Sequence, residues 1–218
     1  MTANVENIVI GILGGTGDQG RGLARRFAMA GHQVIIGSRS EERAGSVAAE
    51  IAHNVQGRTN HDTARDAQIV IAAVPWEGHG HLLESLAPEL AGKIVIDCVN
   101  PIGFDSHGAY PLPVAEGSAA QQAASLLPGS TVVAAFHHVS AKLLLDPEVA
   151  TIDLDVLVLG DNREATDLVQ ALAERIPGVR GVYAGRLRNA SQIEALTANL
   201  VSVNRRYKAH AGLRITDI

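Results

Sequence analysis

The sequence contains very few aromatic residues and a single cysteine. Phe, Trp and Tyr make up 3% of its 218 residues, so the core has to be built from Ala, Val, Ile and Leu. That composition favours a sheet covered by helices over an aromatic-rich sandwich. One cysteine, Cys98, excludes an internal disulfide and a cysteine-based zinc cluster. Because Cys98 lies within an apolar run, we expect it to be a core residue rather than a nucleophile.

A basic excess and a long apolar run are also missing. The net charge is −5, which argues against nucleic-acid binding and against binding to anionic membranes. No apolar run approaches the roughly 18 residues needed to span a bilayer. Residues 1–7 have neither the basic part nor the apolar part of a signal peptide. We therefore expect a cytoplasmic protein whose partners are small molecules.

Short apolar runs alternate with segments of helical periodicity along the chain. The predicted strands are 8–13, 34–36, 69–74, 93–99, 131–135 and 154–159, and the predicted helices are 17–30, 41–52, 78–86, 163–175 and 189–210. Strands rich in Val and Ile that alternate with helices imply right-handed crossovers. The fold class is therefore α/β, with a doubly wound and mostly parallel sheet. Residues 101–117, rich in glycine and proline, are expected to form a long loop.

A glycine motif directly follows the first predicted strand. The segment Gly15-Thr16-Gly17-Asp18-Gln19-Gly20 matches the three-glycine dinucleotide pattern and opens the first predicted helix. In such a motif the first glycine permits a tight turn, the second lets the backbone approach a pyrophosphate, and the third allows close packing of helix on strand. The alternative is an ordinary glycine-rich turn, but the position after a strand favours the Rossmann interpretation. We expect residues 1–160 to form the coenzyme-binding domain and 161–218 a small, mainly helical C-terminal part.

The end of the second strand favours NADP over NAD. Dinucleotide folds that bind NAD carry an Asp or Glu at this position, whereas this chain has Ser38 and Arg39, with Arg43 one turn into the next helix. A hydroxyl and two guanidinium groups suit a 2′-phosphate, because Arg pairs with phosphate oxygens in a fork. The alternative is a helix N-cap at Ser38 or Ser40 beside a solvated arginine.

Three segments follow strands at the edge where ligands of such sheets bind. They are residues 74–77, 99–101 and 136–141. Trp76 either walls the coenzyme cleft or is a core residue, and Asn100 either presents its backbone to the nicotinamide or only ends the strand. His137 and His138 are neighbours and cannot both face the same way on a strand. We expect one to touch the substrate and the other to be structural.

The sequence offers no metal motif and no obvious general acid. His79 and His81 lack the further ligands that a metal site requires, so we expect no metal. None of the three tyrosines is followed by a lysine four places on, so the proton donor of short-chain dehydrogenases is missing. No catalytic side chain can be assigned with certainty. Hydride transfer between two redox rings agrees with this absence, since it needs positioning more than acid–base help.

These residues together resemble a known family. Gly14 to Gly17, residues 37–39, residues 74–76, the segment around His137 and residues 189–196 are similar to NADPH-dependent reductases of coenzyme F420, the F420H2:NADP oxidoreductases. The resemblance covers nearly the whole chain. Residues 114–118 and 204–212 resemble the bacterial, actinobacterial-type branch. Archaeal members have Thr-Ile-Pro where this chain has residues 138–140, so the deazaflavin contacts are expected to differ.

The resemblance implies a homodimer that transfers a hydride reversibly between NADP(H) and F420. By match of motif, the pyrophosphate would be held by Thr16, Gly17, Asp18 and Gln19, and the 2′-phosphate by Ser38, Arg39 and Arg43. Val74, Val99 and Ala141 would line the nicotinamide, while His137 and Val139 would position the deazaflavin. Lys142, Arg205, Arg206 and Lys208 are candidates for attracting its acidic tail, or are solvated helix charges. Two other functions stay open: an NADPH-dependent flavin or ferric reductase, and a non-catalytic NADP(H) sensor.

Overall fold

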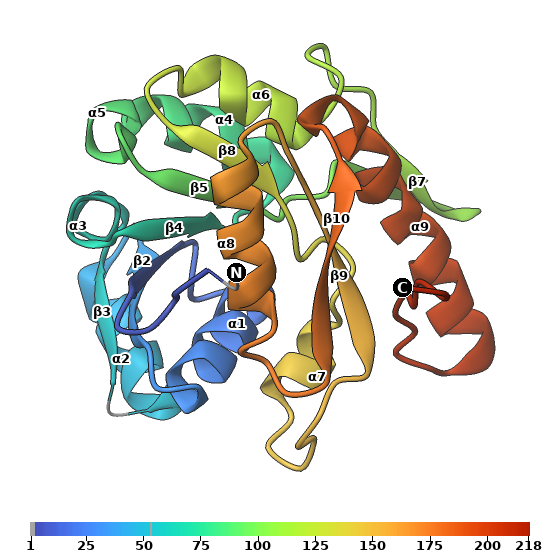
Figure 1. Ribbon diagram of the computed structural model, residues 1–218, viewed down its shortest axis with the longest axis horizontal. Coiled ribbons are helices and arrows are strands. Elements are labelled where there is room, and N and C mark those ends of the chain that lie inside the picture. Colours follow the sequence, from blue (N-terminus) through green and yellow to red (C-terminus); the bar gives the residue numbers. More distant parts are fainter. Residues whose placement is uncertain (1–2, 53) are drawn as a thin grey trace.

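A computed structural model describes residues 3–52 and 54–218. Eight strands form one sheet in the order β10-β9-β8-β5-β4-β1-β2-β3 (Figure 1). Their bounds are β1 Val9–Leu13, β2 Gln33–Ser38, β3 Val55–Thr59, β4 Ile69–Ala72, β5 Ile94–Asp97, β8 Thr131–Ala134, β9 Leu154–Gly160 and β10 Val179–Gly185. Neighbouring strands run parallel except β8 and β9, which are antiparallel. The predicted α/β class and mostly parallel sheet are confirmed.

Helices cover both faces of the sheet. The helices are α1 Asp18–Met29, α2 Glu41–Ile51, α3 Asn60–Asp66, α4 Trp76–Ser85, α5 Ala87–Leu90, α6 Ala119–Leu126, α7 Ala141–Leu145, α8 Arg163–Ala173 and α9 Ala190–Tyr207, with a short 3-10 turn at Leu187–Asn189. One core cluster joins the sheet to α1, α2, α7 and α8, and a second joins its other face to α3 through α6 and the start of α9. The apolar core residues are mostly Ala, Val, Ile and Leu, as the composition predicts.

Several elements were not predicted, and one prediction was wrong in part. Residues 101–117 were expected to form a loop, but they contain an antiparallel hairpin of β6 Ile102–Asp105 and β7 Gly108–Pro111. Its turn is fixed by the Asp105 carboxylate, which accepts the N–H groups of His107 and Gly108 at 2.7 and 3.1 Å. The unpredicted strands β3 and β10 lie at the two edges of the sheet, where polar and exposed residues interrupt the apolar pattern.

The expected boundary near residue 160 falls between β9 and α8. Strand β10, which belongs to the expected C-terminal part, pairs with β9 and extends the same sheet. Helix α9 lies beside the β6–β7 hairpin, at the right of Figure 1. The division into two parts therefore stays a prediction. None of the helices in the described part of the chain has the length and hydrophobicity of a membrane span.

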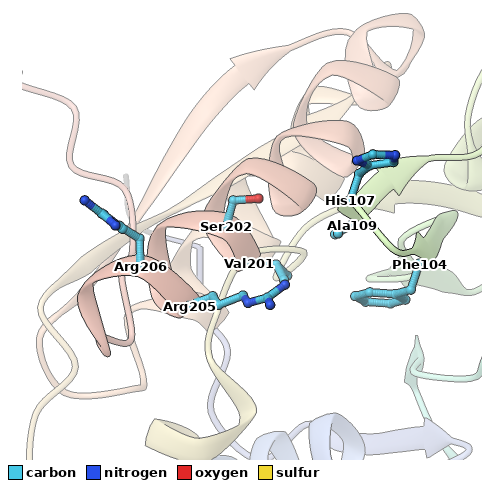
Figure 2. Close-up of a pocket in the computed structure, with 8 residues that line it drawn as sticks. Phe104, His107, Ala109, Val201, Ser202, Arg205 and Arg206 are labelled. Atoms are coloured by element: carbon cyan, nitrogen blue, oxygen red, sulfur yellow. The ribbon is translucent and has the colours of Figure 1, made fainter.

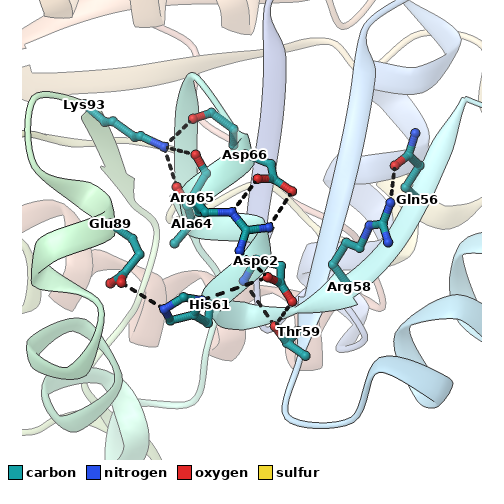
Figure 3. A network of polar contacts seen from close by, with 11 residues as sticks. Gln56, Arg58, Thr59, His61, Asp62, Ala64, Arg65, Asp66, Glu89 and Lys93 are labelled. Carbon is teal, nitrogen blue, oxygen red and sulfur yellow. Dashed lines mark hydrogen bonds and ion pairs between the residues drawn. The ribbon is translucent and has the colours of Figure 1, made fainter.

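A polar network joins helix α3 to α5 and to Lys93, the residue before β5 (Figure 3). The ammonium group of Lys93 donates to the carbonyl oxygens of Ala64, Arg65 and Ala67, at the end of the helix. On the same helix, His61 Nε2 lies 2.8 Å from the Glu89 carboxylate on α5. A cation satisfies carbonyl groups that otherwise have no partner at a helix C-terminus. The network thus holds α3 in the position from which its first residue, Asn60, reaches the glycine turn.

Candidate active site

The strand order reverses between β1 and β4, and the loops that follow these strands meet there. A Cβ atom built on Gly14 would lie 2.6 Å from a methyl carbon of Val74 and 2.8 Å from the Ala73 carbonyl oxygen. Gly14 has a φ of +68°, in the left-handed region that glycine adopts without steric cost. The turn therefore requires glycine for two reasons. The tight turn is at Gly14, one residue before Gly15, where the motif predicts it.

Hydrogen bonds hold the glycine turn in one shape. The amide of Gly14 donates to the side-chain oxygen of Asn60 at 3.2 Å, and the amide of Gly15 donates to the carbonyl oxygen of Gly37 at 2.9 Å. A Cβ atom on Gly20 would lie 2.7 Å from the Cα atom of Gly15. This close approach is the helix–strand packing that the third glycine of the motif predicts. Asn60 was not identified from the sequence.

The N-terminus of α1 opens at Gly17. This residue is the N-cap, its backbone is extended, and no side chain caps the helix. The first N–H groups of a helix have no intrahelical partner, and the helix dipole makes them a site for an anion. A Cβ atom on Gly17 would meet only the Gly14 carbonyl oxygen, at 3.6 Å. The backbone here is exposed and unobstructed, which fits a diphosphate.

The tip of β2 lies next to this turn and carries two arginines. Arg39 and Arg43 are exposed, and neither guanidinium group makes an ion pair or hydrogen bond with the part of the chain that the structure describes. The cap of α2 is Ser40, whose hydroxyl accepts the Arg43 N–H at 3.3 Å. Ser38 is buried, and its hydroxyl accepts only the Ser40 N–H, at 3.4 Å. Both guanidinium groups are thus available for a phosphate beside the glycine turn.

The segment after β8 has an unusual backbone. Phe136 is fully buried with a φ of +65°, a conformation that is costly for a bulky residue. Two contacts stabilise it: its ring packs edge-on against Phe27 at 6.0 Å, and its carbonyl oxygen accepts the Gln19 amide at 3.2 Å. Gln19 belongs to the glycine motif. The strained turn therefore joins the end of β8 to the N-terminus of α1.

His137 and His138 follow directly and are both buried. Burial lowers the pKa of each to about 4, so both imidazoles are neutral near pH 7. Neither ring has a hydrogen-bond partner among the described residues. The backbone of His137 is fixed, because its carbonyl oxygen accepts the Asn100 amide at 2.8 Å and the Thr197 hydroxyl at 3.3 Å. The segment after β5 and helix α9 therefore meet at His137.

The remaining predicted contacts lie around the same edge. Val74 is half-buried at the end of β4, while Val99 after β5 and Val139 after β8 are buried. Ala141 begins α7, which packs against α1 so closely that a Cβ atom on Gly22 would lie 2.6 Å from Leu144. The structure thus gathers the predicted residues around the carboxyl ends of β1, β2, β4, β5 and β8. Their individual roles stay predictions.

Sequence analysis missed a group of buried polar residues behind this edge. His79 on α4 and Asp97 on β5 are both 0% exposed, and His79 Nε2 lies 2.6 Å from Asp97 Oδ2. Glu194 on α9 is also buried, and its carboxylate accepts the N–H groups of Ala119 and Ala120 at 2.9 and 3.2 Å. A single carboxylate inside the apolar run of β5 was an available signal, since a buried charge requires a partner. No group of side chains suited to a metal ion occurs among the described residues.

A groove of about 570 Å³ lies between the β6–β7 hairpin and α9 (Figure 2). The hairpin contributes the Phe104 ring and the His107 imidazole, and α9 contributes Val201, Arg205 and Arg206. No carboxylate lines the groove. Thr197, which contacts Asn100 and His137, lies one turn before Val201 on α9. The groove therefore begins one turn of α9 beyond the contacts at the strand edge.

Comparison with known proteins identifies the family. The chain is 41% identical to the F420-dependent NADP reductase of Methanothermobacter marburgensis, over 96% of this chain and 98% of the relative. The chain belongs to the F420-dependent NADP reductase family. Residues 9–101 match the family model described as NADP oxidoreductase, coenzyme F420-dependent.

One solved structure and one further relative are also similar to this chain. A crystal structure from Arthrobacter sp. FB24, of a protein described as a candidate F420-dependent NADP reductase, superimposes with a TM-score of 0.84. It is 27% identical and covers 97% of this chain and 100% of its own. Metalloreductase STEAP3 of Rattus norvegicus is 33% identical over 88% of this chain, which spans 37% of that protein. The assignment to an actinobacterial-type branch stays a prediction.

Proposed function

We propose that this protein catalyses reversible hydride transfer between NADP(H) and coenzyme F420. The open helix N-terminus at Gly17 carries the proposal. It belongs to the turn that packs against Val74 through Gly14, and the β2 tip that carries Arg39 and Arg43 is hydrogen-bonded to the same turn. The 41% identity to an F420-dependent NADP reductase over nearly the full length supports the choice of acceptor. When bound, the nicotinamide supplies a hydride to the deazaflavin ring, and solvent supplies the accompanying proton.

The chain's own contribution is orientation. Helix-end N–H groups would hold the pyrophosphate, and Val74, Val99 and Ala141 would form the nicotinamide wall. His137 and Val139 would face the deazaflavin. Because the His137 imidazole is neutral, it would place no charge near the transferred hydride. Orienting two rings in van der Waals contact accounts for the absence of an assigned general acid.

An absorbance assay tests this function directly. Mixing the protein with NADPH and oxidised F420 should bleach the visible absorption of the deazaflavin, with NADPH consumed in equal amount. FMN and ferric salts serve as alternative acceptors, since the similarity to a metalloreductase makes ferric reduction the second candidate. Turnover with flavin or iron alone would replace the proposal by that candidate. Tight NADP binding without turnover on any acceptor would indicate a sensor.

Selectivity for NADP would depend on Arg39. Replacing Arg39 with Ala should weaken NADPH binding about 10- to 100-fold, since one charged hydrogen bond contributes roughly 1.5–3 kcal/mol. NADH binding should change little, because NADH lacks the 2′-phosphate. The matched control is Arg163→Ala, which removes an arginine that is 93% exposed on α8. Titration of NADPH and NADH fluorescence measures both affinities, and equal losses for the two coenzymes would exclude the phosphate assignment.

The acidic tail of F420 would lie in the groove between the hairpin and α9. Arg205 and Arg206 line this groove, so they are favoured over Lys142 and Lys208. Exchanging both arginines for Gln should raise the KM for F420 and flatten its dependence on salt, since fewer screened charges remain. The KM for NADPH should stay unchanged.

We also expect the protein to be a cytoplasmic homodimer. Sedimentation equilibrium of the purified chain measures its oligomeric state.

A further inference from the structure

The buried Asp97 carboxylate connects two segments that follow different strands. Its Oδ2 atom lies 2.6 Å from His79 Nε2, and its Oδ1 atom accepts the N–H of Val99 at 3.0 Å. Both side chains of the ion pair are 0% exposed. Asp97 is the last residue of β5, and His79 lies in the first turn of α4, just after the Val74 segment. One carboxylate therefore fixes the loops after β4 and β5 relative to each other.

The surroundings of His79 favour its protonated form. Its Nδ1 atom lies 3.1 Å from the Gln122 side-chain oxygen. Because this oxygen and the Asp97 carboxylate are both acceptors, an imidazolium with a hydrogen on each ring nitrogen satisfies both contacts. Burial alone would lower the pKa of His79, but the hydrogen bond and charge of Asp97 outweigh it and raise the pKa, with smaller contributions from Gln122 and Glu194.

The pair also fixes the one tryptophan of the chain. The Trp76 ring lies on the His79 ring, with centroids 5.6 Å apart and an angle of 32° between the planes. Trp76 begins α4, directly after Val74 and Pro75, and Val74 packs at the Gly14 turn. A chain of contacts thus runs from Val99 through Asp97 and His79 to Trp76, two residues after Val74.

A buried ion pair contributes little net stability compared with apolar residues of similar volume, because desolvation offsets the attraction. Its placement between these two loops is therefore better explained by geometry than by stability. We propose that the Asp97–His79 pair is a positioning device that sets the distance between the Val74 and Val99 loops and so aligns the nicotinamide for hydride transfer. This inference rests on the proposed function. Neither side chain needs to touch the coenzyme, so both are positioning residues.

The test compares three variants with the wild type. His79→Gln keeps a donor for Asp97, whereas Asp97→Asn removes the charge. The double variant His79→Leu/Asp97→Leu removes both charges together, so no unpaired buried charge is left to prevent folding. The control is Asp155→Asn, which removes the charge of a buried carboxylate on β9, outside the proposed site.

We expect the double variant to bind NADPH within about threefold of the wild type while kcat falls at least about tenfold, because a displacement of about 1 Å can cost up to a hundredfold in rate. The deuterium isotope effect with 4-deuterated NADPH should rise as hydride transfer becomes slower. His79→Gln should restore part of kcat. A loss of folded protein would lower kcat without changing the isotope effect. For the control Asp155→Asn we expect the wild-type isotope effect, whatever the change in kcat. A double variant with the wild-type kcat and isotope effect would overturn the proposal.

Two fluorescence measurements separate this inference from the proposed function. In the apo protein, emission of Trp76 should increase in the double variant, because an imidazolium in contact with the indole quenches it. The emission of bound NADPH should fall, since a displaced wall immobilises the nicotinamide less. Both signals are independent of F420. If the wild type fails to reduce F420, the proposed function fails, while unchanged Trp76 and NADPH emission in the double variant would refute the positioning role.

Discussion

Gly17 differs from the other glycines of its turn in having free space around it. A Cβ atom on Gly15 would lie 2.6 Å from Ile36, and one on Gly20 would lie 2.7 Å from Gly15, but the nearest atom to a Cβ on Gly17 is 3.6 Å away. The folded chain therefore tolerates a side chain at Gly17, whereas a bound pyrophosphate would not. In this motif, Gly15 and Gly20 are therefore required for packing, whereas Gly17 is expected to be required for coenzyme binding.

Replacing Gly17 with Val should abolish NADP binding and leave folding nearly intact. The expected loss of stability is below about 1 kcal/mol, because the position is an exposed N-cap with an extended backbone. Gly20→Val should destabilise the protein more, since its side chain would meet the backbone of Gly15. Chemical denaturation and NADP titration of both variants make the comparison. Unchanged NADP affinity in folded Gly17→Val protein would contradict the pyrophosphate assignment.

At the scale of elements, α9 is attached to the start of α6 through a buried carboxylate. Glu194 accepts two N–H groups at the start of α6, where the helix dipole favours a negative charge. Burial nevertheless raises its pKa to about 7, with a further increase from Asp97, while the two N–H groups and His79 act in the opposite direction. The carboxyl group therefore holds its proton more strongly in the folded chain than in the unfolded one.

This shift predicts a pH-dependent contribution to stability. The contribution is fully present below the unfolded pKa of about 4.5 and is lost as the pH rises through about 7. Compared with Glu194→Gln, the wild type should therefore lose on the order of 3 kcal/mol of unfolding free energy between pH 4.5 and 8. Urea denaturation of both proteins across this range measures the difference. Titration of His79 is common to both and largely cancels. The control is Glu174→Gln, at an exposed residue directly after α8. If the difference in unfolding free energy between wild type and Glu194→Gln stays constant with pH, Glu194 remains ionised throughout.

The elements that sequence analysis found are those with one clear periodicity. Continuous apolar runs predicted β1, β4, β5 and β9, because strands covered by helices on both faces are apolar throughout. The edge strand β3 has the sequence Val-Gln-Gly-Arg-Thr and carries little apolar signal. Short helices such as α5 and α7 have too few turns to show a period. The β6–β7 hairpin was missed because glycine and proline suggested a loop.

The candidate site was predictable where it depends on local sequence. The glycine motif and the Ser38-Arg39 tip lie next to strands that the sequence reveals, so their positions followed from the fold. The Asp97–His79 pair and the Glu194 contacts join segments 18 and about 75 residues apart. A pairing of this kind depends on which helices pack on which face, and periodicity contains no information on that choice.

At the scale of the whole molecule, the chain end returns to the sheet. Asp155 on β9 is 0% exposed and accepts hydrogen bonds from Arg180 on β10 at 2.7 and 2.6 Å. After α9, the chain brings Arg214 and the Ile215 amide to the same carboxylate, at 2.8 and 2.6 Å. In Figure 1 the C-terminus accordingly lies between β9 and α9. Helix α9 is therefore held at its start by Glu194 and beyond its end by Asp155.

Removing this second attachment should loosen the C-terminal part without altering the coenzyme turn. The hydrogen bonds from Arg180, Arg214 and Ile215 lower the pKa of Asp155 far below its ordinary value. Its contribution is thus present above the unfolded pKa of about 3.8 and is lost as the pH falls towards the folded value. Asp155→Asn should cost on the order of 2 kcal/mol at pH 7, a modest value because both arginines are partly exposed.

The difference between wild type and Asp155→Asn should shrink when the same denaturation is repeated at pH 3. Asp153→Asn is the matched control, because Asp153 pairs with the same Arg214 but is 79% exposed. Solvent already screens that pair, so its removal should change stability little at either pH. Equal losses in the two variants would mean that burial of the Asp155 carboxylate contributes nothing, and that α9 and the groove beside it do not depend on this attachment.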